Sequence, residues 1–215
     1  MTAATPHIPS QTGTHLPTPT DILNFWLGDG LALGWPSEDM NRRWFLGGAT
    51  LDADIKSRFG HAVQAALQGE LAAWEASLHS RLALVILLDQ FSRNVFRGTA
   101  RAFDGDAHAR QLTLNTLAAH DDLQLPWVGR VFLYMPLMHA EDLALQEKCV
   151  ACFSQLVADA PAALKPKLQG NLDFAIEHKG IIARFGRFPY RNAVMGRTSS
   201  AEEKNFLRDG PRFGQ

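Results

Sequence analysis

One segment of the chain, residues 82–103, constrains the fold more than any other. It begins with seven consecutive apolar residues, Leu82 to Leu88, and then turns polar, with Asp89, Arg93 and Arg97 at intervals of four. A helix that is apolar on all sides is a buried helix, and side chains four residues apart share one helix face. The polar groups therefore emerge directly from the core, where an unpaired charge is costly. We predict that Asp89 is buried and paired with Arg93 or Arg97.

Helical signals recur along the whole chain, whereas the alternating β-branched runs typical of strands are scarce. Thr18 or Thr20 is placed to cap a first helix, and a long helix is expected over about residues 166–184. Pro136 is expected to kink or stop the helix that contains it. The sequence therefore predicts an all-α fold, a helical bundle or solenoid that forms one domain over residues 18–215. A disordered leader is expected over residues 1–17.

Composition excludes several classes of protein and partner. The 215 residues are 46% hydrophobic and 20% charged, and their formal net charge is -1. Such a chain has no excess of positive charge that would attract nucleic acid, and no apolar run is long enough to span a membrane. Its two cysteines, Cys149 and Cys152, do not make a disulfide framework. We expect a cytoplasmic protein that uses no metal and no cofactor, since no standard motif for either is present.

The first candidate site follows the apolar run and consists of Asp89, Gln90, Arg93, Asn94 and Arg97. Asp89 is placed to orient guanidinium groups toward an anionic ligand, which the planar arginine fork binds in a bidentate manner. The alternative is a structural network of ion pairs that ties loops to the central helix.

The second candidate site follows Pro136 and contains His139, Glu141 and Asp142. A histidine beside carboxylates is typical of general acid–base catalysis. We predict catalytic roles for His139, Asp89 and Glu141. The alternative is that Glu141 and Asp142 only stabilise the N-terminus of the next helix.

The third candidate site is a late segment that is rich in arginine and aromatic residues. Its predicted ligand-binding residues are His178, Arg184, Arg187, Arg191 and Asn192. The segment has few carboxylates to neutralise its arginines, and buried cations without acids attract an external anion. We therefore expect Arg187 or Arg191 to meet Arg93 in one pocket, with His139 near its wall.

Three stretches of the chain resemble blocks of a known family. These are LLDQFSRNVFRGTARAF, FLYMPLMHAEDLALQE and HKGIIARFGRFPYRNAVMGR, preceded by DILNFWLG and RRWF. They resemble the bacterial domain-of-unknown-function family 924 from Asp21 to about Leu207. The resemblance implies an all-helical fold similar to tetratricopeptide-repeat proteins, and it implies no activity. One departure is Ser92, where the family pattern DQFPRN has a proline that would mark a helix break.

Two functions fit these patterns. The first is a soluble protein with a pocket rich in Arg, His and Asp that binds or transforms a small anionic molecule. The second is a scaffold, similar to tetratricopeptide-repeat proteins, that binds a peptide or partner protein. An enzyme or small-molecule binder would gather the polar groups in one closed pocket, and a scaffold would spread them along an open surface. The sequence leaves catalysis and the oligomeric state open.

Overall fold

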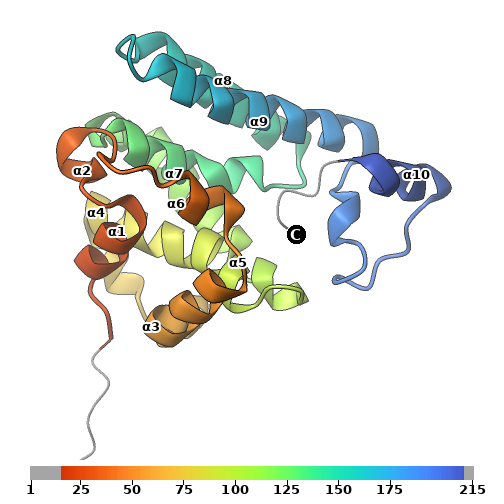
Figure 1. Cartoon of the computed structure of the whole chain (residues 1–215), viewed down its shortest axis with the longest axis horizontal. Coiled ribbons are helices and arrows are strands. Elements are labelled where there is room, and N and C mark those ends of the chain that lie inside the picture. The colour runs from red at the N-terminus through yellow and green to blue at the C-terminus, as the bar shows by residue number, and fades with distance from the viewer. Residues whose placement is uncertain (1–15, 211–215) are drawn as a thin grey trace, which may run out of the picture.

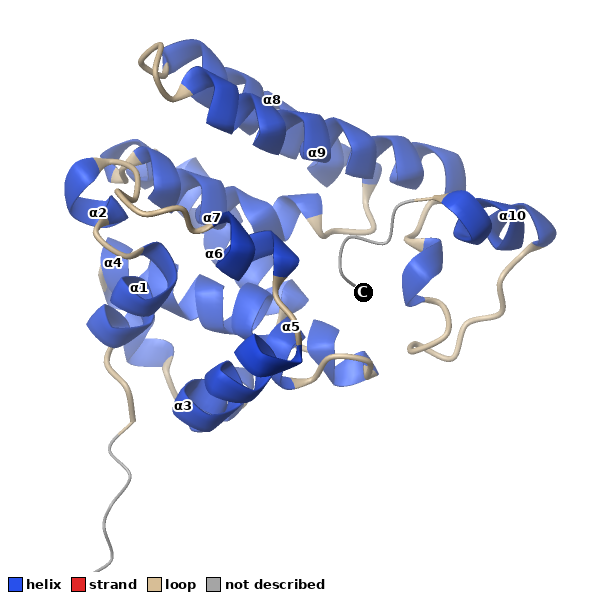
Figure 2. Cartoon of the chain, viewed as in Figure 1, coloured by secondary structure: helices blue, strands red, loops and turns tan. Residues whose placement is uncertain are grey.

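A computed structural model of the protein describes residues 16–210, and the regular structure in that range is entirely helical (Figures 1 and 2). The all-α prediction is therefore confirmed, while the likeness to tetratricopeptide-repeat proteins stays a prediction. The predicted leader lies outside the described residues except for its last two positions. The elements are α1 (Pro19–Leu27), α2 (Gly30–Leu33), η1 (Arg42–Leu46), α3 (Ala49–Leu67), η2 (Ala72–Ala76), α4 (Leu78–Val85), η3 (Ile86–Phe91), α5 (Ser92–Val95), η4 (Ala100–Phe103), α6 (Asp106–Ala118), η5 (Asp121–Gln124), α7 (Trp127–Met138), α8 (Leu143–Asp159), α9 (Lys165–Phe185), η6 (Pro189–Arg191) and α10 (Ala201–Asp209).

Side-chain caps fix the N-termini of α1 and α10. Thr18 accepts a hydrogen bond from the Asp21 backbone N–H at 3.2 Å, and the Asp21 carboxylate accepts from the Thr18 backbone N–H. Ser200 and Glu203 form the same reciprocal pair at the start of α10. Each pair satisfies backbone N–H groups that have no partner within the helix.

The helix α7 continues through Pro136 and ends at Met138, so the proline does not stop it. Pro136 removes one backbone hydrogen bond from the helix. Every residue from Val131 to Met138 is nevertheless buried, and this packing holds the helical path.

The central segment is buried as the sequence predicted. None of the residues from Leu82 to Leu88 exposes more than 1% of its surface. The helix α4 packs against α1, α6 and α7, and η3 continues the contacts with α3 and α6. Aromatic rings surround its end, since Trp26 contacts Phe91 and Phe132 at ring-centroid distances of 5.2 and 5.9 Å. The segment is apolar on all sides, and the surrounding helices bury every side of it, which fixes it at the centre of the core.

The chain after α7 forms a helical hairpin and a small C-terminal unit. Figure 1 shows α8 and α9 side by side along one edge of the molecule, with α10 and the preceding loop beyond the far end of α9. A separate apolar cluster holds this end, built on Ile181, Ile182 and Phe188. An ion pair of 2.6 Å between Arg197 and Glu141 ties it to the loop after α7. This return of the chain brings η6 close to the polar end of the central helix.

Gly105 allows α6 to begin directly against η3. A Cβ atom at this position would lie 2.5 Å from the backbone oxygen of Leu88. Real Cβ atoms do not approach a carbonyl oxygen so closely, so only glycine fits without a shift of the backbone. The close approach places Asp106, the first residue of α6, beside the polar end of the central helix.

We predict that Gly105→Ala lowers the free energy of unfolding by about 1–3 kcal/mol, because the added methyl group overpacks the contact with Leu88. Chemical denaturation of the parent and the variant measures this difference.

The matched control is Gly180→Ala in α9, where nothing lies within 4 Å of the added Cβ atom. This change should raise stability by up to about 1 kcal/mol, because alanine favours a helix interior over glycine. A Gly105→Ala variant that gained stability in the same way would contradict the close approach.

Candidate functional site

A wide helical turn shapes the polar end of the central helix. In η3 the hydrogen bonds follow a π-helical pattern. The Ser92 N–H donates to the backbone oxygen of Leu87, five residues earlier, whereas an α-helix uses the oxygen four residues earlier. The helix then continues into α5 without the break that a proline would cause, because serine keeps this N–H group. Turns of this kind are frequent at functional sites, since they shift side chains out of the regular helical positions.

Asp89 lies in this turn and is completely buried. Its Oδ1 accepts a hydrogen bond of 2.7 Å from Nδ1 of His139 and lies 3.6 Å from the guanidinium of Arg93. The prediction of a buried Asp89 paired with Arg93 is confirmed, whereas Arg97 pairs elsewhere. Burial raises the pKa of Asp89, but His139 and Arg93 outweigh that effect and hold the pKa well below its usual value.

His139 directly follows the last residue of α7, and Gln146 fixes the backbone on either side of it. The Gln146 side chain donates hydrogen bonds of 2.6 and 2.8 Å to the oxygens of Met138 and Ala140, on either side of His139. Since an ionised carboxylate only accepts, the His139 Nδ1 carries the proton that binds Asp89. Burial lowers the pKa of His139, and Arg93 lowers it further against the opposing effect of Asp89. The ring is therefore neutral near pH 7, and Nε2 is its basic nitrogen.

Asp106 joins the two arginine-containing segments. It forms a bidentate pair with Arg93, with distances of 2.9 and 3.2 Å, and lies 3.4 Å from Arg191 of η6. The arginines of the two segments therefore converge. The expectation that these arginines are short of acids is wrong, because Asp106, which lies outside both segments, supplies a carboxylate to each of them.

Arg191 is nevertheless the less neutralised of the two cations. It exposes only 5% of its surface, and its guanidinium lies between the rings of Phe103 and Phe188 at 4.5 and 4.6 Å. Its Nε atom is buried without a hydrogen-bond partner among the described residues. Burial lowers the pKa of Arg191, and the nearby charge of Arg93 adds to this effect. Arg191 also shares a side-chain hydrogen bond with Tyr190. Since its ion pair within residues 16–210 is the long one with Asp106, an additional anion is favourable at this position.

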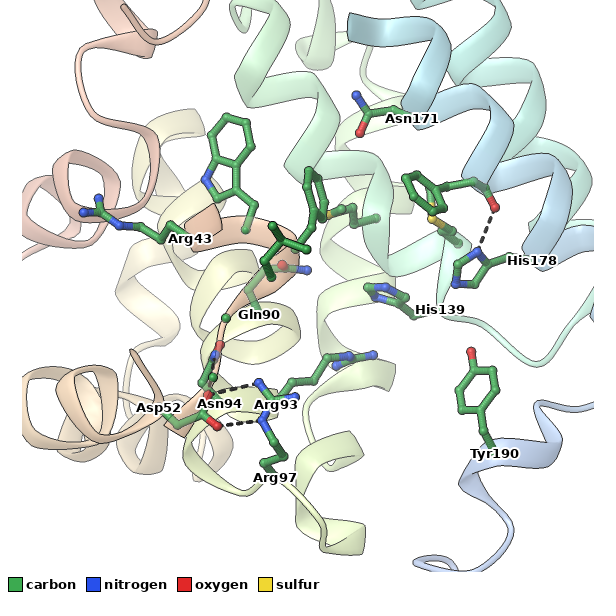
Figure 3. A pocket seen from close by; sticks show the side chains of 18 of the residues that line it. Arg43, Asp52, Gln90, Arg93, Asn94, Arg97, His139, Asn171, His178 and Tyr190 are labelled. Carbon is green, nitrogen blue, oxygen red and sulfur yellow. Dashed lines mark hydrogen bonds and ion pairs between the residues drawn. The ribbon is translucent and has the colours of Figure 1, made fainter. Parts of the chain in front are cut away.

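Arg93, His139 and Arg191 line a pocket of about 510 Å³ (Figure 3). The pocket lies between η1, the start of α3, α5, the end of α7, α9 and η6. Figure 3 shows Arg93 and Arg97 at one end of the view and Asn171 at the other. The predicted site residues that line the pocket are Arg93, Asn94, Arg97, His139, His178 and Arg191.

His178 lies opposite His139, with 6.2 Å between the ring centroids. Its Nδ1 donates a hydrogen bond of 2.7 Å to the backbone oxygen of Phe174. Burial lowers the pKa of His178 to about 3, and the neighbouring His139 contributes to the shift. Tyr190 stands near both rings in Figure 3, and burial raises the pKa of its hydroxyl, which therefore stays protonated. Both imidazoles are thus neutral hydrogen-bonding groups near pH 7.

Other predicted site residues lie outside the pocket lining and secure the C-terminal part of the chain. Glu141 accepts from the Phe188 N–H at 2.8 Å and pairs with Arg197, so its carboxylate is engaged in structure. Arg187 pairs with Glu203 at 2.7 Å. Arg184 pairs with Glu202 of α10 at 2.8 Å, and Asn192 donates a hydrogen bond of 3.0 Å to Ser199, which precedes that helix.

Asp52 is a second site residue that the sequence did not reveal. Its carboxylate pairs with Arg97 at 2.6 Å and accepts from Asn94 at 2.8 Å. Asp52 and Asp106 both lie in the first turn of a helix, where an acid is expected for the helix dipole alone. The sequence therefore gives a reason for an acid at each position, but it does not show that either acid pairs with a distant arginine.

The described residues offer no metal centre and no membrane span. Among residues 16–210, no group of three or more His, Cys, Asp or Glu side chains is placed to hold a metal ion. No helix in the same range combines the length and the apolar character that crossing a bilayer requires. None of the residues that line the pocket is Ser, Thr, Cys or Lys. The lining contributes arginines that could bind an anion and His139, which could transfer a proton.

Comparisons with known proteins agree with the resemblance found in the sequence. The family described as "Bacterial protein of unknown function (DUF924)" matches residues 22–211. The solved structure of ATU0120, a protein of unknown function from Agrobacterium tumefaciens, is 35% identical to the chain and aligns with a TM-score of 0.72. That alignment covers 89% of this chain and 97% of the other. Among curated proteins, none matches the chain.

We predict that Asp89→Asn lowers the free energy of unfolding by about 3–5 kcal/mol, because it leaves Arg93 without one partner of a buried ion pair. Urea denaturation of parent and variant measures the loss. The control is Asp52→Asn, whose partner Arg97 has a side chain that is 38% exposed. It should cost less than about 1 kcal/mol, as partly exposed pairs do. Equal losses in both variants would contradict the burial of the Asp89 pair.

We also predict that stability falls with acidification in a way that depends on His178. Its pKa is about 3 in the folded protein, against an ordinary value of 6.5, so the unfolded chain binds the proton first as the pH drops. Between these values the free energy of unfolding falls by at most about 1.4 kcal/mol per pH unit for this one group. Urea denaturation at several pH values should show a shallower slope for His178→Phe. An unchanged slope would show that His178 is protonated in the folded state.

Proposed function

Because the chain belongs to the bacterial family DUF924, whose description names no activity, we propose a function from the site itself. The pocket binds a small anionic molecule at Arg93 and Arg191. The pair formed by His139 and Asp89 then acts as a general base on that molecule or on a water beside it. The cytoplasm, suggested by the two unpaired cysteines, is part of the same proposal.

The observation that carries the anion site is the state of Arg191. It is buried and lines the pocket. Its carboxylate contact within residues 16–210 is a 3.4 Å pair with Asp106, which already binds Arg93 through both oxygens. A guanidinium group in such surroundings gains more from an anion than one in water does, because the local dielectric is low. An anion in the pocket would reach Arg191 and Arg93 together.

The geometry of His139 supports the proposed base. Asp89 holds the Nδ1–H at 2.7 Å, which fixes the tautomer and leaves Nε2 to accept a proton. Proton transfer to Nε2 would create an imidazolium that the Asp89 carboxylate stabilises directly. The same proton would return to the product or to water, so the pair is restored after each turnover. General bases of this kind act best when they are held by a second group.

The scaffold alternative is less well supported by the position of the polar groups. Arg93, His139, His178 and Arg191 come from separate elements and line one cavity. A scaffold similar to tetratricopeptide-repeat proteins would distribute such residues along a concave surface. A cavity of about 510 Å³ is of the size that holds a small molecule.

Thermal unfolding with added anions tests the anion site. Phosphate, sulfate and succinate, each compared with chloride at matched ionic strength, should raise the melting temperature of the parent. A ligand that binds only the native state adds about 2.7 kcal/mol at about a hundred times its dissociation constant. Arg191→Gln should lose this response, each shift being measured against its own anion-free value.

The control for charge is Arg184→Gln. It removes an arginine that is paired with Glu202 at the surface, outside the pocket. It should respond to anions as the parent does. Shifts of equal size in the parent and both variants would reduce the effect to general salt stabilisation and would refute the anion site.

A further inference from the structure

The pocket has an apolar wall as well as a cationic end. The wall comes from three elements, with Trp44 and Phe45 on η1, Met135 and Met138 on α7, and Phe174 on α9. The two methionines are three residues apart and therefore lie on one face of their helix. Methionine is flexible and polarisable, and it packs well against aromatic rings. A ligand with an apolar body would contact this wall, whereas a small inorganic anion held by the arginines would not.

Some of the apolar groups at the rim are exposed to solvent. Phe45 is 41% exposed, Leu46 is 76% exposed and Phe174 is 45% exposed. The rings of Phe45 and Phe174 are nearly parallel, at a centroid distance of 6.3 Å and an interplanar angle of 29°. Single exposed apolar residues are ordinary, but a group of them at the rim of a pocket is typical of a binding surface.

A second cavity of about 510 Å³ continues the pocket beyond this aromatic pair. The two cavities share Trp44, Phe45, Asn171 and Phe174 in their linings. Asn171 lies in Figure 3 at the end of the view remote from Arg93 and Arg97. The aromatic pair therefore lies between two hollows, and the space for a ligand extends away from the arginines.

The arginines of the pocket fit a ligand that carries a carboxylate. Its four arginines face three carboxylates while both histidines are neutral, which leaves a surplus of one positive charge. The arginines are Arg43, Arg93, Arg97 and Arg191, and the carboxylates are Asp52, Asp89 and Asp106. Within residues 16–210, Arg43 has no carboxylate partner and lies over the ring of Phe25 at 4.8 Å. The surplus belongs to Arg43, which donates a hydrogen bond to the backbone oxygen of Phe25. A carboxylate matches the planar guanidinium forks of Arg93 and Arg191.

We infer that the ligand is an amphipathic carboxylate, with its anionic group at Arg93 and Arg191 and a flat apolar body against Phe45, Phe174 and the two methionines. This inference rests on the proposed anion site and adds the chemical class of the molecule that fills it. The ligand's apolar body would cover the exposed aromatic rings at the rim, and the removal of their apolar surface from water would favour binding.

Isothermal titration with three probes tests the inference. The probes are 3-phenylpropionate, acetate and the uncharged 3-phenylpropionamide. The first should bind at least about tenfold more tightly than acetate, because it buries an apolar ring that acetate lacks. It should also bind at least about tenfold more tightly than the amide, because only the acid forms charged hydrogen bonds with the arginines.

Two variants on α9 locate the apolar contact. Phe174→Ala should bring the affinity for 3-phenylpropionate close to that for acetate and leave acetate binding unchanged. Ile176→Ala removes a side chain of similar exposure, 48%, from the same helix but outside both cavities. It should bind 3-phenylpropionate as the parent does.

The outcomes separate this inference from the proposed function. Equal affinities for acetate and 3-phenylpropionate, both lost in Arg191→Gln, would overturn the amphipathic ligand and leave the anion site standing. Equal affinities for the acid and the amide would overturn the role of the charge. If neither these carboxylates nor the inorganic anions bind, both the inference and the anion site fail.

Discussion

The buried ion pairs around Arg93 are the interaction on which the rest of the site depends. Asp89 on one side and Asp106 on the other hold this guanidinium, and each carboxylate also reaches a second group, His139 or Arg191. The four side chains around Arg93 thereby join η3, α6, α7 and η6. Breaking a buried pair leaves an uncompensated charge in a medium that solvates it poorly. The positions of Asp89, Asp106, His139 and Arg191 are therefore tied to the pairing of Arg93.

The features that the sequence predicted well depend on local patterns. Seven apolar residues before Asp89 required a buried helix, and a spacing of four residues placed Arg93 beside that acid. The all-helical fold followed from caps and helical periodicity in the same way. The approach of Arg191 to Arg93 could be expected only from its type and surroundings, namely an arginine among aromatic residues after an apolar helix.

The features that escaped prediction depend on contacts between distant segments. Asp52 and Asp106 stand where any helix favours an acid, so nothing in the sequence distinguishes a pair with Arg97 or Arg93 from a simple helix-dipole effect. Glu141 illustrates the reverse error, because its place next to His139 suggested catalysis while the fold engages it with Arg197. An ion pair needs both partners to be located, and the sequence locates one residue at a time.

The wall of the pocket also completes the first helix of the protein. Arg43 and Trp44 of η1 donate side-chain hydrogen bonds to the backbone oxygens of Phe25 and Trp26, in the last turn of α1. Carbonyl groups in a last turn have no partner within their own helix. The end of α1 and the entrance of the pocket therefore form one cooperative unit, so a molecule that orders η1 also protects a helix that it does not touch from local opening.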